Sequence, residues 1–390
     1  MKYIYTYVLL LLSIYNTAQN LVPNPSFEYT SCPVTFSSIN GCLPWTGTIG
    51  TPDYYNTCSS NTSSSVPKNF LDMNYQIPKT GNAYAGFEPF AIYGNNSREN
   101  LSEQLINNLI NNSYYLVRFY VVNAQLYPSA HNNIALNFSS ALTTTVSAGN
   151  TVNLPMHIYK FGNPIIADTL NWQEIMGIYK ANGTEQYITI GNFKDDASTN
   201  IDFTRFGNSP PFAAYYMIDD VSVEPICTPF WSYRDTTLAI GQDSVLIGPA
   251  ITGLNINWYD ATNTLITNAP GIYVKPAQTT TYTAVEDFCG TTYTNTIVVT
   301  VQPTGLRDLS YLNEVVGVSP NPAHNELKLA IKNIKDTEQL MIKITDVLGK
   351  EVLIADYKEQ LDISVLEKGV YFLSLYHDKQ LIITKKIIKE

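Results

Sequence analysis

The chain has 390 residues, which is enough for two or three domains with cores of their own. Only 14% of the residues are charged, while 28 Tyr, 21 Gly and 21 Pro accompany many Asn, Ser and Thr. This composition favours an all-β protein made of several β-sandwiches. The formal net charge is -10, and the acidic excess lies before residue 304. Nucleic acid and anionic membranes are therefore poor partners for the front part.

The first residues, 1–18, have the pattern of a secretory signal peptide. Lys2 supplies the positive start, residues 7–14 form a short apolar run, and Thr17-Ala18 offers small residues for cleavage. A signal anchor is the alternative, but a spanning helix needs about 18 or more apolar residues. No later segment is that long and apolar, so we expect no membrane span in the mature chain.

Residues 19–225 form a long series of β patterns, which we interpret as one all-β domain. The clearest strand patterns are residues 115–123, 133–138, 172–179, 186–193 and 215–223. One stretch, residues 98–112, is ambiguous. Its leucines and isoleucines fit a helical face, and strand with loop is an equal alternative.

The two ends of this domain carry recognisable motifs. Residues 24–28 read NPSFE, and residues 218–223 read IDDVSV. This pairing resembles the galactose-binding-like jelly roll of many carbohydrate-binding modules. Residues 51–56, 81–86 and 183–193 are also similar to an amino-terminal domain common in proteins exported by type IX secretion. These resemblances imply a jelly roll and specify its fold more than its ligand.

Residues 226–303 are expected to form a second domain. Residues 255–259 and 282–285 read as strands, and Trp258 is the natural core residue. The run of threonines before Tyr282, followed by Cys289-Gly290, resembles a bacterial immunoglobulin-like domain. It departs from the antibody pattern, because Cys227 lies far ahead of Trp258, so a bond to Cys289 would staple the domain's start to a late strand. The resemblance implies a spacer, and residues 304–312 read as a linker.

The last domain, residues 313–390, opens with an extended turn. Pro320 and Pro322 flank Asn321, and the fixed φ of the prolines forbids helix there. Apolar alternation over residues 340–344 is followed by Gly349-Lys350, a turn that needs positive φ at the glycine. Because the alternation resumes after this turn, the pattern predicts a β-hairpin.

Two further strand patterns complete a small sandwich. Residues 368–373, which include Gly369 and Tyr371, are apolar on both faces, and residues 381–390 form a β-branched run rich in lysine. The order PNP, DVLGKEV, KGVYFLSL and KKIIK resembles the type A C-terminal sorting domain of the type IX secretion system. The resemblance implies that the type IX machinery is a partner and that the protein is extracellular or at the outer-membrane surface. An ordinary small β-module is the alternative.

Five cysteines in an exported chain suggest disulfides rather than metal thiolates. Cys227 and Cys289 bracket one domain, and their bond would contribute roughly 4 kcal/mol in the chain-entropy model. Among the other three, we pair Cys32 with Cys58. This choice leaves Cys42 without an assigned partner.

Carboxylates at the ends of the jelly roll suggest a structural calcium ion. Glu28 and Asp219 lie on the first and last strands, which are neighbours in this fold, and Asp220 is a substitute ligand. Calcium gathers about 6–8 oxygen ligands. In similar carbohydrate-binding modules these two positions hold structural calcium. Solvated carboxylates at strand ends are the alternative.

Aromatic side chains are the remaining candidates for a ligand surface, because sugars stack their C–H faces on such rings. Tyr54 and Tyr55 lie in a turn-rich stretch, and we expect them to be exposed and to bind ligand. Trp45, Trp172 and Trp258 are predicted to be core residues.

No motif for catalysis is apparent. The four histidines are isolated, and neither HExxH, G-x-S-x-G nor a phosphate-binding glycine loop occurs. Glycoside hydrolysis stays open, because it needs only two carboxylates whose separation is not visible in sequence. We therefore expect a secreted, non-catalytic binding or adhesion protein that takes a glycan or a surface protein through its jelly roll. The alternatives are a glycosidase or polysaccharide lyase, and a purely structural component of an extracellular matrix.

Overall fold

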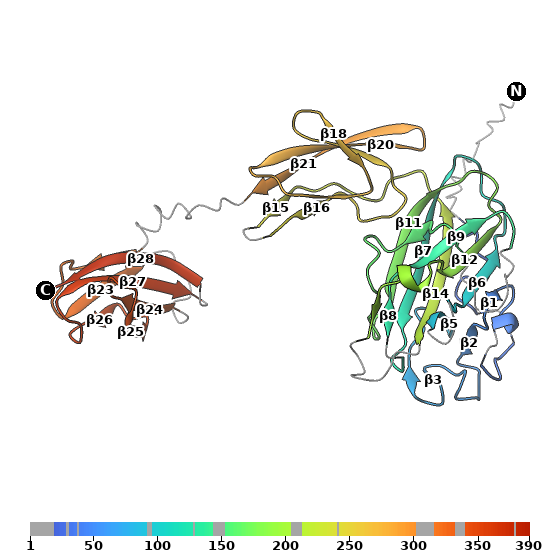
Figure 1. Ribbon diagram of the computed structural model, residues 1–390, viewed down its shortest axis with the longest axis horizontal. Coiled ribbons are helices and arrows are strands. Elements are labelled where there is room, and N and C mark those ends of the chain that lie inside the picture. Colours follow the sequence, from blue (N-terminus) through green and yellow to red (C-terminus); the bar gives the residue numbers. More distant parts are fainter. Residues whose placement is uncertain are drawn as a thin grey trace, which may run out of the picture. The chain divides into compact units, whose positions relative to one another are not determined.

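The computed structural model describes residues 19–28, 31–36, 39–91, 96–127, 129–142, 153–203, 213–239, 242–301, 316–331, 340–377 and 380–390. These residues form strands joined by turns and two short 3-10 segments, so the expected all-β class is confirmed (Figure 1). The chain divides into two compact units, residues 1–301 and 302–390. The expected signal peptide and the linker at 304–312 lie outside the described residues. Within the described ranges, no helix has the length and apolar character needed to cross a membrane.

The first unit begins with a sandwich of two five-stranded sheets. The first sheet has the order β1 (Thr46–Ile49), β6 (Asn100–Gln104), β12 (Tyr187–Asn192), β9 (Ile134–Ser139) and β10 (Ile158–Tyr159). The second has the order β11 (Gln173–Lys180), β7 (Tyr114–Asn123), β14 (Ala213–Pro225), β5 (Ala83–Ala91) and β2 (Asp53–Asn56). Smaller elements are η1 (Ile39–Gly41), β3 (Lys68–Asn69), β4 (Asn74–Tyr75), β8 (Ala130–His131), η2 (Asp196–Ser198) and β13 (Ile201–Asp202).

Two apolar clusters pack on opposite faces of the second sheet. The main core lies between the two sheets and contains Phe27, Trp45 and Phe119. A smaller cluster covers the outer face, where Phe70 of the turn between β3 and β4 packs with Tyr215 of β14. Successive side chains of a strand point to opposite faces, so the strands of this sheet bury side chains on both of its faces.

The ambiguous stretch at residues 98–112 is strand and loop rather than helix. Residues 100–104 form β6, and the following loop bonds to a distant segment rather than to itself. Leu105 N–H donates to the Gln186 carbonyl at 2.9 Å, and Leu109 N–H donates to the Glu185 carbonyl at 3.0 Å. These long-range bonds replace the i to i-4 bonds that a helix would need.

A second β-module follows in the same unit, and we call it the immunoglobulin-like module after the sequence expectation. One sheet has the order β15 (Thr236–Leu238), β21 (Thr291–Val301), β20 (Thr280–Phe288), β17 (Ile256–Tyr259) and β18 (Leu265–Asn268), and β16 (Val245–Ile247) pairs with β19 (Ile272–Val274). Trp258 is fully buried in its core, as expected. Leu116 and Ile178 of the first sandwich belong to the same core cluster. The expected boundary between residues 225 and 226 therefore stays a prediction, because the two modules share a core.

The second unit is a small sandwich. A three-stranded sheet has the order β22 (Val316–Ser319), β23 (Glu326–Ile331) and β26 (Gln360–Asp362). A four-stranded sheet has the order β25 (Glu351–Asp356), β24 (Leu340–Thr345), β27 (Gly369–His377) and β28 (Gln380–Lys389).

The motif residues of the second unit occupy the positions expected from the sequence. Strands β24 and β25 form the predicted hairpin, with φ of +83° at Gly349 beside Lys350 in its turn. Asn321, between Pro320 and Pro322, fastens the last strand, since its amide donates to the Lys386 carbonyl and its oxygen accepts from Ile388 N–H, both at 2.8 Å. In β27, Tyr371 follows Gly369 and is buried.

Two disulfides join the cysteines that the sequence pairs. Cys32 bonds to Cys58 with a Cα–Cα distance of 5.8 Å, and Cys227 bonds to Cys289 with a Cα–Cα distance of 5.5 Å. Cys42 is buried and is the free cysteine within the described ranges. Burial raises the pKa of the Cys42 thiol far above its ordinary value, so this thiol is inert.

Candidate functional site

The three carboxylates predicted to bind calcium meet around one loop, residues 79–83. Asp219 Oδ2 accepts hydrogen bonds from the backbone N–H groups of Lys79 at 2.8 Å and Thr80 at 3.3 Å. Asp220 accepts from the Thr80 hydroxyl at 2.6 Å. Glu28 Oε1 accepts from the N–H groups of residues 82 and 83 at 2.6 and 3.0 Å. Residues 24–28, which form bends and turns rather than the expected first strand, and strand β14 thus place these side chains together.

Backbone amides donate to Asp219 and Glu28, and a hydroxyl donates to Asp220. At Gly81 φ is +62°, and a Cβ there would lie 2.2 Å from Glu28 Oε1, so this close approach requires glycine. Burial, followed by the charge of Asp220, raises the pKa of Asp219 to about 8. Within the described residues, no three side chains of His, Cys, Asp or Glu converge as a metal site requires. Calcium therefore fits this loop only with backbone oxygens as further ligands, and it stays a prediction.

The expected exposure of Tyr54 and Tyr55 is wrong. Their exposed fractions are 1% and 0%. Tyr54 packs into the main core, while Tyr55 points to the outer face and packs against Phe70. The loop that covers the outer face comes from elsewhere in the sequence, so neither ring is available to stack on a sugar.

The tryptophan predictions succeed at two of three positions. Trp45 and Trp258 are fully buried. Trp172, expected in the core, is only half-buried just before β11, where its indole N–H donates to the Ile77 carbonyl at 3.0 Å. Its predecessor Asn171 is exposed, because the strand is just entering the sheet.

A cavity on the outer face of the second sheet combines aromatic rings with carboxylates, and we name it the acidic pocket. Its volume is about 320 Å³. It is lined by Phe36, Thr51, Asp53, Phe70, Glu88, Glu99, Tyr127 and Tyr215. Strand β2 supplies Asp53, β5 supplies Glu88 and β14 supplies Tyr215, so three neighbouring strands build its floor. None of the described lining residues is basic.

A glycine lets the floor of the acidic pocket form. A Cβ on Gly86 of β5 would lie 2.2 Å from the Tyr215 hydroxyl, so only glycine allows this side chain to cross β5. The Tyr215 hydroxyl then donates to Asp53 Oδ2 at 2.5 Å, and the Tyr55 hydroxyl lies 2.8 Å from that of Tyr215. Burial, followed by the Asp53 charge, raises the pKa of both tyrosines well above the ordinary value. Both hydroxyls therefore stay protonated and serve Asp53 as donors.

Glu99 and Glu88 differ in their protein partners. Glu99 accepts from the backbone N–H groups of Thr51 and Glu88, both at 2.8 Å, so its carboxylate ties a loop to β5. Glu88 lies where the ladder between β5 and β14 shifts register, a geometry that re-aims side chains. Among the described residues, no hydrogen bond or ion pair engages the Glu88 carboxylate. It is the carboxylate of the acidic pocket that is left for a ligand.

The electrostatics of the acidic pocket favour neutral carboxyl groups. Burial, then the charges of Glu99 and Asp53, raises the pKa of Glu88 to about 8. Burial also raises the pKa of Glu99, to about 7, because it outweighs the bonds from Thr51 and Glu88. Near neutral pH, Glu88 is therefore largely protonated and can both donate and accept a hydrogen bond.

Sequence reasoning missed all three carboxylates of the acidic pocket. One signal was present: Glu88 is a lone carboxylate in a strand, AYAGFEPFA, that is otherwise apolar on both faces. Such a residue either finds donors inside the fold or faces a cavity. The sequence around Asp53 and Glu99 contains no comparable signal.

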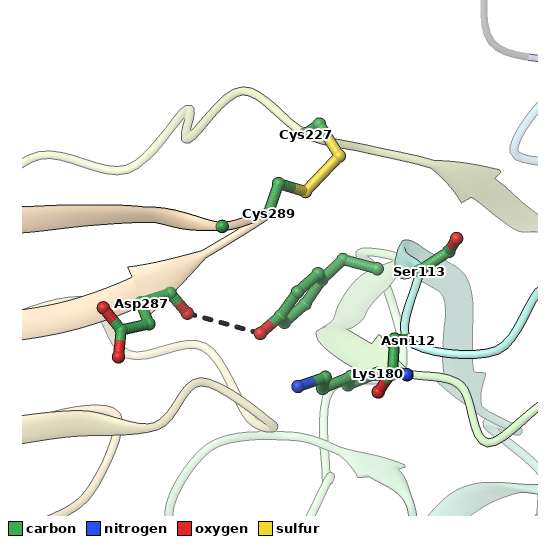
Figure 2. A pocket seen from close by; sticks show the side chains of 8 residues that line it. Asn112, Ser113, Lys180, Cys227, Asp287 and Cys289 are labelled. Atoms are coloured by element: carbon green, nitrogen blue, oxygen red, sulfur yellow. Dashed lines mark hydrogen bonds between the residues drawn. A yellow bond between two sulfur atoms is a disulfide. The ribbon is translucent and has the colours of Figure 1, made fainter.

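A second cavity, the junction pocket, lies between the first sandwich and the immunoglobulin-like module (Figure 2). Its volume is about 570 Å³. It is lined by Asn112, Ser113, Tyr114, Lys180, Cys227, Asp287, Cys289 and Gly290. The Cys227–Cys289 disulfide stands at one side, and the Tyr114 hydroxyl donates to the Asp287 carbonyl at 3.3 Å.

Comparison with known proteins identifies the end of the chain. Residues 317–390 match the family model of the secretion system C-terminal sorting domain. The protein is therefore exported by type IX secretion to the cell surface or the extracellular medium. A search of curated proteins finds no match.

Several solved structures resemble the chain at low identity. The CBM22-1 xylan-binding domain of Paenibacillus barcinonensis Xyn10C matches with TM-score 0.29 and 12% identity over 54% of this chain and 97% of that one. The Epf adhesin domain of Streptococcus pyogenes matches with TM-score 0.25 and 9% identity over 74% and 99%. The K1 cleaved adhesin domain of Lys-gingipain from Porphyromonas gingivalis W83 matches with TM-score 0.25 and 16% identity over 51% and 95%. At these identities and TM-scores, only the chain's own residues can indicate what it binds.

Proposed function

We propose that this exported protein is a non-catalytic binding protein whose acidic pocket takes a sugar unit of a glycan. One observation carries the proposal: the acidic pocket joins aromatic side chains to a carboxyl group, Glu88, that has no donor or acceptor among the described residues. Sugars offer C–H faces to rings and hydroxyl groups to carboxyls, so both kinds of lining have a use.

Size and charge narrow the ligand. A cavity of about 320 Å³ is near the lower end of the range for small-ligand sites, so it suits one or two sugar units better than a protein surface. Three carboxyl groups without a basic partner in the lining disfavour anionic ligands. A neutral or amino sugar is therefore the ligand class that this cavity supports best, and a surface protein is the alternative.

The test uses the mature chain, residues 19–390, on an array of neutral, amino and acidic glycans, followed by calorimetric titration of those retained. We expect a neutral or amino glycan to bind and Glu88→Gln to weaken it about tenfold, since a buried donor or acceptor left unsatisfied costs about 1–3 kcal/mol. The matched control is Glu174→Gln, an exposed glutamate on β11 outside the acidic pocket. An unchanged affinity of Glu88→Gln, or no glycan retained, contradicts the proposal.

A second function has one observation in its favour. A carboxyl group with its pKa raised to about 8, beside the two further carboxyl groups of Asp53 and Glu99, has the protonation state that a glycosidase general acid needs. Incubating each bound glycan with the protein and separating the products by chromatography decides between them. Product release that Glu88→Gln abolishes would make the protein an enzyme. If no glycan binds and no product is released, the function that remains is a structural role in an extracellular layer.

A further inference from the structure

The junction pocket is built from both modules of the first unit. Asn112, Ser113, Tyr114 and Lys180 come from the first sandwich, while Asp287 and the Cys227–Cys289 disulfide come from the immunoglobulin-like module (Figure 2). Its volume of about 570 Å³ lies within the range of small-ligand sites. It shares no lining residue with the acidic pocket, so it is a separate candidate.

Tyr114 holds the two walls of the junction pocket together. Its backbone carbonyl accepts from Ile226 N–H at 2.9 Å, its hydroxyl donates to the Asp287 carbonyl at 3.3 Å, and its ring packs on Phe288 with centroids 4.5 Å apart. One residue of the sandwich thus bonds to both ends of the segment that the disulfide closes.

A second contact fixes the same two modules. Ile178 N–H of β11 donates to the Thr252 carbonyl at 2.8 Å. A Cβ on the next residue, Gly253, would lie 1.7 Å from the Ile178 carbonyl oxygen, so the module approaches the strand as closely as backbone allows. With two separate contacts and a shared core, the pocket is preformed, and a ligand would not have to order its walls.

Three polar side chains of the junction pocket can donate hydrogen bonds, those of Asn112, Ser113 and Lys180. Lys180 is exposed, and among the described residues no carboxylate lies within ion-pair distance of its ammonium group. Its Nζ atom lies over the Tyr114 ring, 5.5 Å from the ring centroid. Within the same ranges, the side-chain amide of Asn112 and the Ser113 hydroxyl make no hydrogen bond. Asp287, the acid in the lining, already accepts from the Thr292 hydroxyl at 2.5 Å.

We infer that the junction pocket binds the carboxylate of an acidic sugar, that is, a uronic acid unit of a polysaccharide. An ammonium group, an amide and a hydroxyl facing one cavity match the acceptor oxygens of a carboxylate and its neighbouring hydroxyls. The disulfide and the side of the Tyr114 ring offer apolar surface to the sugar's C–H groups. The acidic pocket has three carboxyl groups and no basic side chain in its described lining, so it offers a carboxylate no comparable site.

The test titrates the mature chain with trigalacturonate, with neutral galactotriose and with tetra-aspartate, by calorimetry at low and at moderate salt. We expect trigalacturonate to bind more tightly than the other two and to weaken as salt rises, because an exposed lysine supplies the charge. Lys180→Gln should weaken trigalacturonate about tenfold. The matched control is Lys68→Gln on β3, an exposed lysine that lines neither pocket.

Each outcome decides the inference. Equal binding of the acidic and neutral sugars, or unchanged affinity of Lys180→Gln, overturns it. If tetra-aspartate binds more tightly than trigalacturonate, a uronic acid is the wrong ligand class and the junction pocket is a peptide site. Glu88→Gln serves as a second control, since trigalacturonate affinity should be unchanged in it even if the acidic pocket proves to bind nothing.

Discussion

Two sets of carboxylates in the first sandwich have the same chemistry and different surroundings. Glu28, Asp219 and Asp220 surround the loop at residues 79–83, and donors of that loop engage all three. In the acidic pocket, Asp53 and Glu99 are likewise engaged by protein donors, whereas Glu88 is not engaged among the described residues. The difference teaches that burial alone does not mark a functional carboxylate. The donors that the fold supplies decide whether it fastens a loop or is left for a ligand.

The sharpest way to break this comparison is to replace an acceptor oxygen of Asp219 by a donor. Asp219→Asn turns an amide N–H₂ toward backbone N–H groups that need an acceptor, and a buried donor left unsatisfied costs about 1–3 kcal/mol. We expect the melting temperature of the first unit to fall by about 5–10 °C, since 1 kcal/mol corresponds to about 2–4 °C for a domain of this size.

The matched control is Asp220→Asn. Asp220 is half-buried, has φ of +51° and accepts from the Thr80 hydroxyl, and asparagine tolerates that backbone and keeps an acceptor. Its melting temperature should stay within about 2 °C of the wild type. Scanning calorimetry of both variants checks the pair. Equal losses in the two would mean that the amides at residues 79 and 80 do not depend on Asp219.

Much of the fold was predictable because its signals are local. Turn residues and strand alternation predicted the hairpin at Gly349, and the two motifs at the ends of the first domain correctly placed Glu28 near Asp219. Cysteines that bracket one module sufficed for the Cys227–Cys289 bond. Each of these inferences used neighbouring residues, or a known order of motifs along the chain.

The acidic pocket was not predictable for the opposite reason. Asp53 and Glu88 meet because β2 pairs with β5, and Tyr215 reaches Asp53 only because Gly86 leaves room. Tyr55 was expected on the surface, yet Phe70 of a later loop covers it. A sequence records which residues have a given chemistry, but long-range pairing and loop cover decide which of them face a cavity.

The raised pKa values predict how stability depends on pH. Burial is the largest cause at Asp219, Glu88 and Glu103, each with pKa raised to about 8, and at Glu99, raised to about 7. Carboxyl groups in the unfolded chain titrate near pH 4. The folded state therefore binds more protons, and the stability from these groups is complete below about pH 4 and is lost as pH rises toward about 8. The melting temperature of the first unit should rise by several degrees from pH 8 to pH 5, and a fall would contradict this.

Calcium would reverse that trend at one of the two carboxylate sets. A cation beside Glu28 and Asp219 would hold Asp219 ionised, lower its pKa and stabilise the first unit at pH 8. If the calcium prediction holds, excess chelator should lower the melting temperature by several degrees and make its pH dependence steeper. Elemental analysis of the purified protein is the companion measurement. No bound metal, together with identical melting curves, would mean that hydrogen bonds from the protein are sufficient for these carboxylates.

The smallest expected effect tests the acidic pocket itself, through the matched variants Glu99→Gln and Glu88→Gln. Glu99 accepts two backbone N–H groups, so losing one of its acceptor oxygens should cost about 1–2 kcal/mol. Glu88 has no such bond among the described residues, and glutamine removes a carboxyl whose ionised form is destabilised by burial and by Asp53. We therefore expect Glu88→Gln to lie within about 0.5 kcal/mol of the wild type at pH 4 and to be more stable than the wild type at pH 9. Urea unfolding at both pH values measures the difference directly. A loss at Glu88 as large as at Glu99 would mean that both carboxylates fasten the fold, and a binding defect in Glu88→Gln could then no longer be assigned to lost contact with a glycan.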